Sequence, residues 1–73
     1  MNELFRYRKD DRTRAYAIRP VGEDSSELWV SAAARGRVTS SRRLVTFGKT
    51  DDVAQFLESI EQELRAGGWT RGG

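Results

Sequence analysis

The residues best suited to chemistry in this sequence are arginines that alternate with aromatic side chains near its start. In residues 4–9, Phe5 and Tyr7 share one face of an extended segment, and Arg6 and Arg8 share the other. A second group of arginines follows in residues 37–43. Guanidinium groups pair with carboxylates and phosphates, and aromatic rings supply buried contact area. We therefore select seven candidate partner-binding residues: Phe5, Arg6, Tyr7, Arg8, Arg37, Arg42 and Arg43.

Residues for catalysis or metal binding are scarce. The chain has no His and no Cys, which removes the usual general base, thiolate nucleophile and zinc ligands. Gly48-Lys49-Thr50 resembles the end of a phosphate-binding loop, but Arg43 stands where that motif needs a glycine. The acidic pairs fall at expected turns or helix caps, where carboxylates are common for local reasons. We expect no enzymatic activity, no metal, no cofactor and no small-molecule substrate.

Charge is distributed unevenly along the chain. Residues 1–49 carry eleven basic and six acidic side chains, a net charge of +5. Residues 50–73 carry two basic and five acidic side chains, a net charge of −3. A basic first part favours an acidic protein or a nucleic acid as the partner.

Period-two alternation predicts the elements that position these residues. The expected strands are residues 4–9, 14–19, 28–33 and 42–47, with turns at 10–13 and 34–41 and a polar loop at 22–27. The spacing then changes, because Val53, Phe56, Leu57, Ile60 and Leu64 form one helical stripe. We expect a helix over about 51–66, capped by Thr50 or Asp51 and ended by Gly67-Gly68, with a frayed tail at 70–73.

The expected fold class is α+β, one small domain over residues 1–73. A four-stranded, mainly antiparallel sheet precedes one C-terminal amphipathic helix in a two-layer arrangement. The strand order and the sheet face that the helix covers stay open. Phe5, Tyr7 and Trp29 have an alternative role as core residues. The longest apolar run is residues 15–18, far too short for a membrane span, so we expect none, and the start of the chain lacks a signal segment. A cytoplasmic protein is expected.

Three features of the chain resemble domains of nucleic-acid-binding families. Residues 47–69 resemble the sheet-to-helix half of arm-type integrase DNA-binding domains, and the succession of strands along the chain is similar to that of single-strand-binding transcription coactivators. Ala34-Arg-Gly-Arg-Val38 resembles a Trp-Gly-Arg domain, with Ala34 in place of the tryptophan. These resemblances imply an alternative function as a stand-alone sheet-type DNA- or RNA-binding module. A third possibility is an accessory protein that dimerises through its helix or an edge strand.

The whole chain, in its size and its arginine-rich strands-then-helix layout from Met1-Asn-Glu-Leu-Phe-Arg-Tyr-Arg, resembles small transcription regulators of lytic phages. This resemblance implies a protein in the host cytoplasm that binds bacterial RNA polymerase, blocks initiation at promoters and promotes antitermination. In this hypothesis Phe5 and Tyr7 become buried at the contact, and Arg6 and Arg8 pair with carboxylates. The arginines at 37, 42 and 43 reach acidic protein or nascent RNA or DNA nearby. The N-terminal strand, as a sheet edge, would receive the partner.

Overall fold

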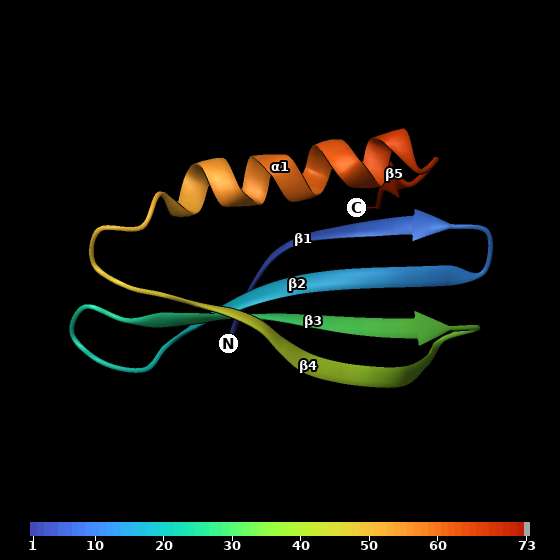
Figure 1. Ribbon diagram of the computed structural model, residues 1–73. Coiled ribbons are helices and arrows are strands. Elements are labelled where there is room, and N and C mark those ends of the chain that lie inside the picture. Colours follow the sequence, from blue (N-terminus) through green and yellow to red (C-terminus); the bar gives the residue numbers. More distant parts are fainter. Residues whose placement is uncertain (73) are drawn as a thin grey trace.

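The computed structural model describes residues 1–72 as an open antiparallel sheet with one helix on one face (Figure 1). The strands lie in the order β4-β3-β2-β1-β5. Their bounds are β1 Asn2–Lys9, β2 Arg12–Pro20, β3 Ser26–Ala34, β4 Arg37–Phe47 and β5 Thr70–Arg71, and the helix α1 spans Val53–Ala66. The expected α+β fold class, with the helix after the four long strands, is confirmed.

The β3–β4 turn is much shorter than the sequence suggested. Arg35 and Gly36 have φ of +54° and +80°, as in the two-residue hairpin turns that match the twist of the strands. Strand β4 therefore begins at Arg37, and the expected turn over residues 34–41 is wrong. Its first half pairs with β3, with Val38 opposite Ala33 and a bulge between this pair and the pair Ala32–Ser40. Polar residues at 39–41 hid this strand because they carry no apolar alternation.

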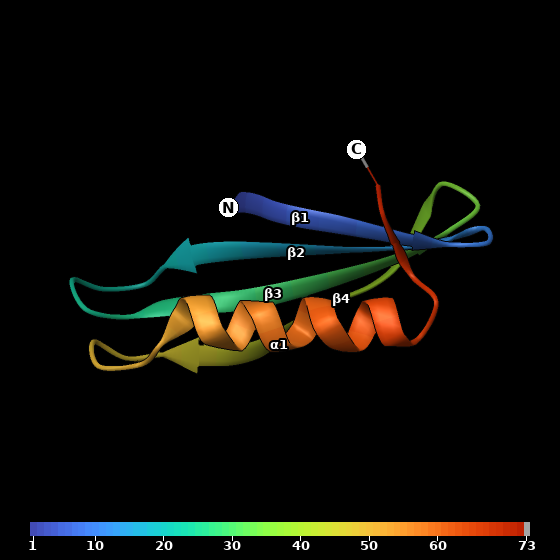
Figure 2. The ribbon, with the colours of Figure 1, turned by 90° about the horizontal axis from the view of Figure 1, so that it is seen from above.

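Helix α1 covers the sheet face that carries Phe5 and Tyr7. The sequence had left open which face the helix covers. Figure 2 shows α1 lying lengthwise along the strands. The buried core consists of Phe5, Tyr7, Tyr16, Leu28, Val30, Phe47 and Leu64. Trp29, another expected core residue, pairs across the sheet with Ala17 on the opposite face and is only half-buried. The alternation of side chains along β3 sends Leu28 and Val30 toward α1, so Trp29 must point away.

The ends of α1 are fixed by backbone hydrogen bonds. The Asp52 side chain accepts from the Gln55 N–H at 3.0 Å, so Asp52 is the N-cap and the expected cap at Thr50 or Asp51 is wrong. Asp51 instead accepts from the Gly48 N–H at 2.6 Å and shapes the connection from β4. After the helix, the Trp69 N–H donates to the Leu64 carbonyl at 2.9 Å, which turns the chain back over the sheet.

The C-terminal segment is ordered where fraying was expected. Strand β5 pairs antiparallel with β1, with Arg71 opposite Tyr7, and the Gly72 N–H donates to the Arg6 carbonyl at 2.8 Å. The expectation of a frayed tail is wrong for residues 70–72, and Gly73 lies outside the described residues. Within the described part of the chain, no helix is both long enough and apolar enough to cross a membrane.

Candidate functional site

Phe5 and Tyr7 lie inside the protein, so they are not surface anchors. Their exposed fractions are 7% and 0%, because α1 covers the face of β1 from which they project. The Phe5 ring lies 5.0 Å from the Tyr16 ring and meets Tyr7 edge to face at 5.8 Å. The expectation that these two aromatics become buried at a partner contact is therefore wrong for the folded chain.

The Tyr7 hydroxyl is tied to the helix by a hydrogen bond. It donates to Glu61 Oε1 at 2.7 Å, and the Arg71 guanidinium donates to the same oxygen at 3.2 Å. Burial, and after it the Glu61 carboxylate, raises the pKa of the Tyr7 phenol. These contacts join β1, α1 and β5, which is a structural role.

The two candidate arginines of β1 differ in how far they are engaged. Arg6 donates to Glu3 at 2.7 Å, and the hydrogen bond and charge of Glu3 raise the pKa of the Arg6 guanidinium. Both side chains remain about half exposed, so the pair stays in contact with water. Arg8 is exposed and forms no ion pair with an acidic side chain in residues 1–72. Arg8 is thus the more available cation of this strand.

The three arginines of the other group all lie on β4. Arg37 and Arg42 are exposed and have no acidic partner among the described residues. Arg42 lines a cavity on the α1 side of the sheet, together with Tyr16, Val30 and Leu44. Arg43 lies next to it and points to the opposite face, where it donates to Glu27 Oε2 at 3.2 Å. Strand β4 contains no acidic residue, so it is a cationic edge of the sheet.

The fold separates the candidate arginines into two groups. Strands β2 and β3 lie between β1 and β4, and three strand spacings amount to roughly 14 Å. Arg6 and Arg8 therefore do not form one cluster with Arg37 and Arg42. The outer edge of β1 is also partly occupied by β5, whereas the outer edge of β4 pairs with no strand in residues 1–72. The free edge expected at the N-terminal strand lies along the full length of β4.

A buried carboxylate that the sequence analysis did not single out organises the face opposite α1. Glu27 is only 8% exposed. Its Oε1 accepts from Arg19 Nη2 at 2.6 Å and from the Trp29 indole at 3.1 Å, and Arg43 binds its other oxygen. The hydrogen bonds from Trp29 and then Arg19 hold the pKa of Glu27 below its ordinary value of 4.5. A signal for this site was present in the sequence. Side chains two residues apart in a strand share a face, so Glu27 and Trp29 lie together on the face opposite Leu28.

A second group missed in the sequence surrounds Trp69. The Arg14 guanidinium lies 4.7 Å from the centre of the indole ring, and Arg12 lies 5.8 Å from it. These distances are typical of cation–π contacts. They come from the fold alone, since Trp69 is far from β2 in sequence. The stacking leaves Trp69 half-buried at the end of α1.

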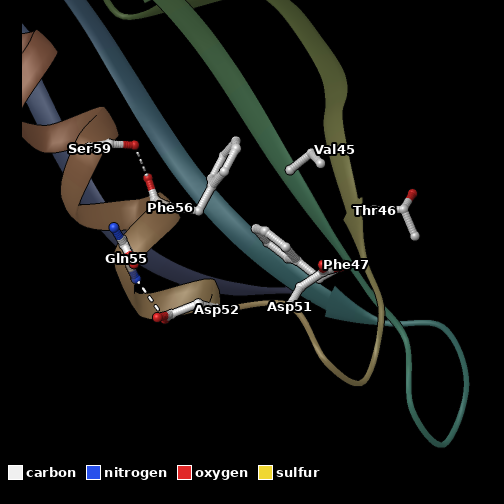
Figure 3. Close-up of a pocket in the computed structure, with 8 residues that line it drawn as sticks. All are labelled: Val45, Thr46, Phe47, Asp51, Asp52, Gln55, Phe56 and Ser59. Atoms are coloured by element: carbon white, nitrogen blue, oxygen red, sulfur yellow. Dashed lines mark hydrogen bonds between the residues drawn. The ribbon is translucent and has the colours of Figure 1, made fainter.

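Helix α1 leaves open space along β4, which we call the α1–β4 groove. One end is a cavity of about 570 Å³ lined by Val45 and Phe47 of β4 and by Phe56 of the helix (Figure 3). The other end, of about 340 Å³, is bounded by Leu44 and Arg42 and by the last turns of α1. Along this groove Leu44 and Val45 of β4 stay partly exposed, whereas Tyr7 and Tyr16 of β1 and β2 are buried.

Comparison of the chain with protein-family models, curated proteins and solved structures finds no match to any of them. Within residues 1–72, no three His, Cys, Asp or Glu side chains gather into a possible metal site. The candidate site is therefore described by its own geometry: a free, cationic edge strand beside a groove that is apolar at one end.

Proposed function

We propose that this protein is a non-enzymatic transcription regulator that docks on bacterial RNA polymerase in the cytoplasm, inhibiting initiation and promoting antitermination. Two lines of evidence support the proposal. The whole chain resembles small phage regulators with this activity. The observation that carries the docking step is strand β4, which presents exposed arginines without acidic partners along an edge with no neighbouring strand in the described residues.

The contact is assigned mainly to the arginines of β4, with Arg8 as a second point. Arg37 and Arg42 are free to form forked hydrogen bonds with carboxylates of the polymerase. Arg43 contributes less, because it is held by Glu27. The apolar part of the contact comes from Val38, which is 71% exposed, and from the α1–β4 groove, since Phe5 and Tyr7 are buried.

A stand-alone nucleic-acid-binding module receives less support from the geometry. Single-strand-binding sheets stack bases on exposed aromatic rings. Here the aromatic side chains of β1, β2 and β4 lie under α1, and Trp29 on the opposite face is partly covered by Arg19 at 5.7 Å. The arginines alone would bind nucleic acid without such a platform, and this outcome is tested together with the main proposal.

The experiment is binding of the purified chain to purified bacterial RNA polymerase, measured by biolayer interferometry. The double variant Arg37→Ala, Arg42→Ala removes two unpaired cations of β4. The matched control Lys49→Ala, Arg65→Ala removes the same charge from the β4–α1 connection and the helix. We expect binding by the wild type and the control, and at least about tenfold weaker binding by the β4 variant, as is typical of truncated interface arginines.

Two outcomes would contradict the proposal. One is no binding of the wild type to the core enzyme or the holoenzyme. The other is tight binding to an oligonucleotide without polymerase, with affinity that falls by roughly 0.7–0.9 in log K per log salt for each phosphate contacted. If binding is present, promoter-dependent initiation should fall and read-through at a terminator should rise in transcription reactions with the purified protein.

A further inference from the structure

Strand β4 offers the most extensive unpaired backbone in the described part of the chain. It is 11 residues long and lies at the end of the sheet, with β3 on its inner side only. The opposite end of the sheet is partly closed by β5. An edge strand exposes N–H and C=O groups that form hydrogen bonds readily with another extended segment. The backbone of β4 is therefore a template for strand addition.

The groove beside this edge has an apolar end. Figure 3 shows Val45 of β4 and Phe56 of α1 at this cavity, and the Phe56 ring meets the buried Phe47 ring edge to face at 5.3 Å. The carboxylates at its rim are already engaged in local structure, Asp51 with the Gly48 N–H and Asp52 with the Gln55 N–H. A side chain entering here from an added strand meets aliphatic and aromatic surface. This end of the groove therefore fits an apolar side chain.

The other end of the groove is cationic. Arg42 and Arg14 line the same two cavities, and small Ala32 lies on the β3 side between them. Neither arginine forms an ion pair within residues 1–72. Glu63 is the one acidic residue at the rim on the helix side, and it forms no ion pair within that range either. Arg14 is stacked on Trp69, so Arg42 is the guanidinium that a carboxylate from an added strand would pair with.

The spacing of these ends defines a sequence pattern for the occupant. Arg42 and Phe47 are separated on β4 by a bulge between the pairs Leu28–Val45 and Trp29–Arg43. In an added strand, side chains on one face recur every second residue, about 6.8 Å apart. The acidic and apolar side chains of the occupant should therefore lie two or four residues apart.

We propose that β4 binds an extended, acidic segment of a partner protein by strand addition, with an apolar side chain near Val45 and Phe56 and an acidic side chain against Arg42. Charge argues against a second copy of this chain as the occupant. Edge-to-edge pairing of two β4 strands would bring six arginines together with no acid on either strand. The inference deepens the proposed function and rests on it for the existence of a protein partner.

The test uses a short capped peptide, Thr-Asp-Thr-Asp-Thr-Phe-Thr, added to the full chain labelled with ¹⁵N. We expect saturable amide shifts that map to β4 and to the residues of the groove. The same peptide with alternate N-methylated residues, which cannot complete a ladder of hydrogen bonds, should lose binding at least about tenfold. Absence of binding by the first peptide, or equal binding by both, would overturn strand addition.

A charge exchange tests the acidic position. Arg42→Glu should lower the affinity for the acidic peptide at least about tenfold and raise the affinity for a peptide with Lys in place of Asp. Arg65→Glu makes the same change in charge on α1, outside the lining of the groove, and should leave binding unchanged. Circular dichroism verifies that both variants are folded. Equal effects of the two substitutions would mean that only net charge matters, which contradicts the assigned site.

Other occupants of β4 and the proposed function are distinguished by the same reagents. If sedimentation shows a dimer, the occupant of β4 is a second copy of the chain. If an oligonucleotide shifts the β4 amides and binds with higher affinity than the peptide, the occupant is a nucleic acid. Either result would overturn the inferred acidic segment. If the chain binds RNA polymerase, the Arg37→Ala, Arg42→Ala variant weakens that binding and the peptide does not bind, the polymerase proposal stands and strand addition fails. If the peptide binds as expected and no polymerase is bound, strand addition stands and the partner must be another protein.

Discussion

At the scale of single residues, Glu27 makes the stability of the sheet depend on pH. Its carboxylate accepts hydrogen bonds from Trp29, Arg19 and Arg43, and these hold its pKa below 4.5 in the folded chain. A lowered pKa contributes stability that is fully present above the unfolded-state value and is lost as the pH falls through the folded-state value. The melting temperature should therefore drop as the pH is lowered below about 4.5.

The variant Glu27→Gln tests this assignment. It keeps the shape of the side chain but removes the charge that three donors address. We expect a lower melting temperature at pH 7 and a smaller further loss between pH 5 and pH 3 than in the wild type, measured by circular dichroism. An acid-induced loss of the same size in both proteins would show that another group is responsible.

The hydroxyl of Tyr7 gives a second prediction. Tyr7→Phe removes a hydrogen bond to the Glu61 carboxylate in a fully buried position, and hydrogen bonds to charged groups contribute about 1.5 kcal/mol or more. The free energy of unfolding in urea should fall by about that amount. Tyr16→Phe is the control, since Tyr16 is also buried, at 5% exposed, but forms no hydrogen bond to a carboxylate in the described residues. An equal effect of both substitutions would contradict the assigned hydrogen bond.

The roles of individual residues were predictable from the sequence only in part. Alternation correctly paired Phe5 with Tyr7 and Arg6 with Arg8, because neighbouring side chains of a strand must point to opposite faces. It did not tell which face the helix covers, and that choice moved Phe5 and Tyr7 from the contact surface to the core. The Arg14–Trp69 and Arg19–Glu27 contacts join strands or segments whose pairing is invisible in a single sequence.

At the scale of elements, α1 depends on its cap. Asp52→Ala removes the acceptor for the Gln55 N–H and should lower the free energy of unfolding by about 1 kcal/mol, the usual cost of losing a side-chain N-cap. Urea denaturation measures the change. Asp24→Ala, in the exposed loop between β2 and β3, is the control and should have little effect. If Asp52→Ala is as stable as the control, the cap contributes nothing.

Elements with apolar patterns were predictable and polar ones were not. The helix stripe from Val53 to Leu64 and the strands around Tyr16 and Leu28 follow from period and composition. The first half of β4 is held by pairing with the alanines of β3 and by the turn at Arg35-Gly36. Strand β5 is only two residues long and exists through its partner β1, so no local signal marks it.

At the scale of the molecule, the unequal distribution of charge acquires a spatial meaning. The basic residues of the first part lie on both faces and the outer edge of the sheet, whereas Glu58 lies on the exposed surface of α1 and Glu63 at the rim of the α1–β4 groove. Strand β4 is the place where positive charge, free backbone and an open groove coincide. An acidic partner would thus approach β4 and be repelled by the far side of the helix.

Hydrogen–deuterium exchange of the chain, alone and bound to purified RNA polymerase, addresses this arrangement most directly. The account predicts that amides of residues 37–47 exchange more slowly in the complex, while those of the β1–β2 hairpin change little. Complex formation with no slowing in residues 37–47, or with slowing confined to β1 and the exposed surface of α1, would contradict it.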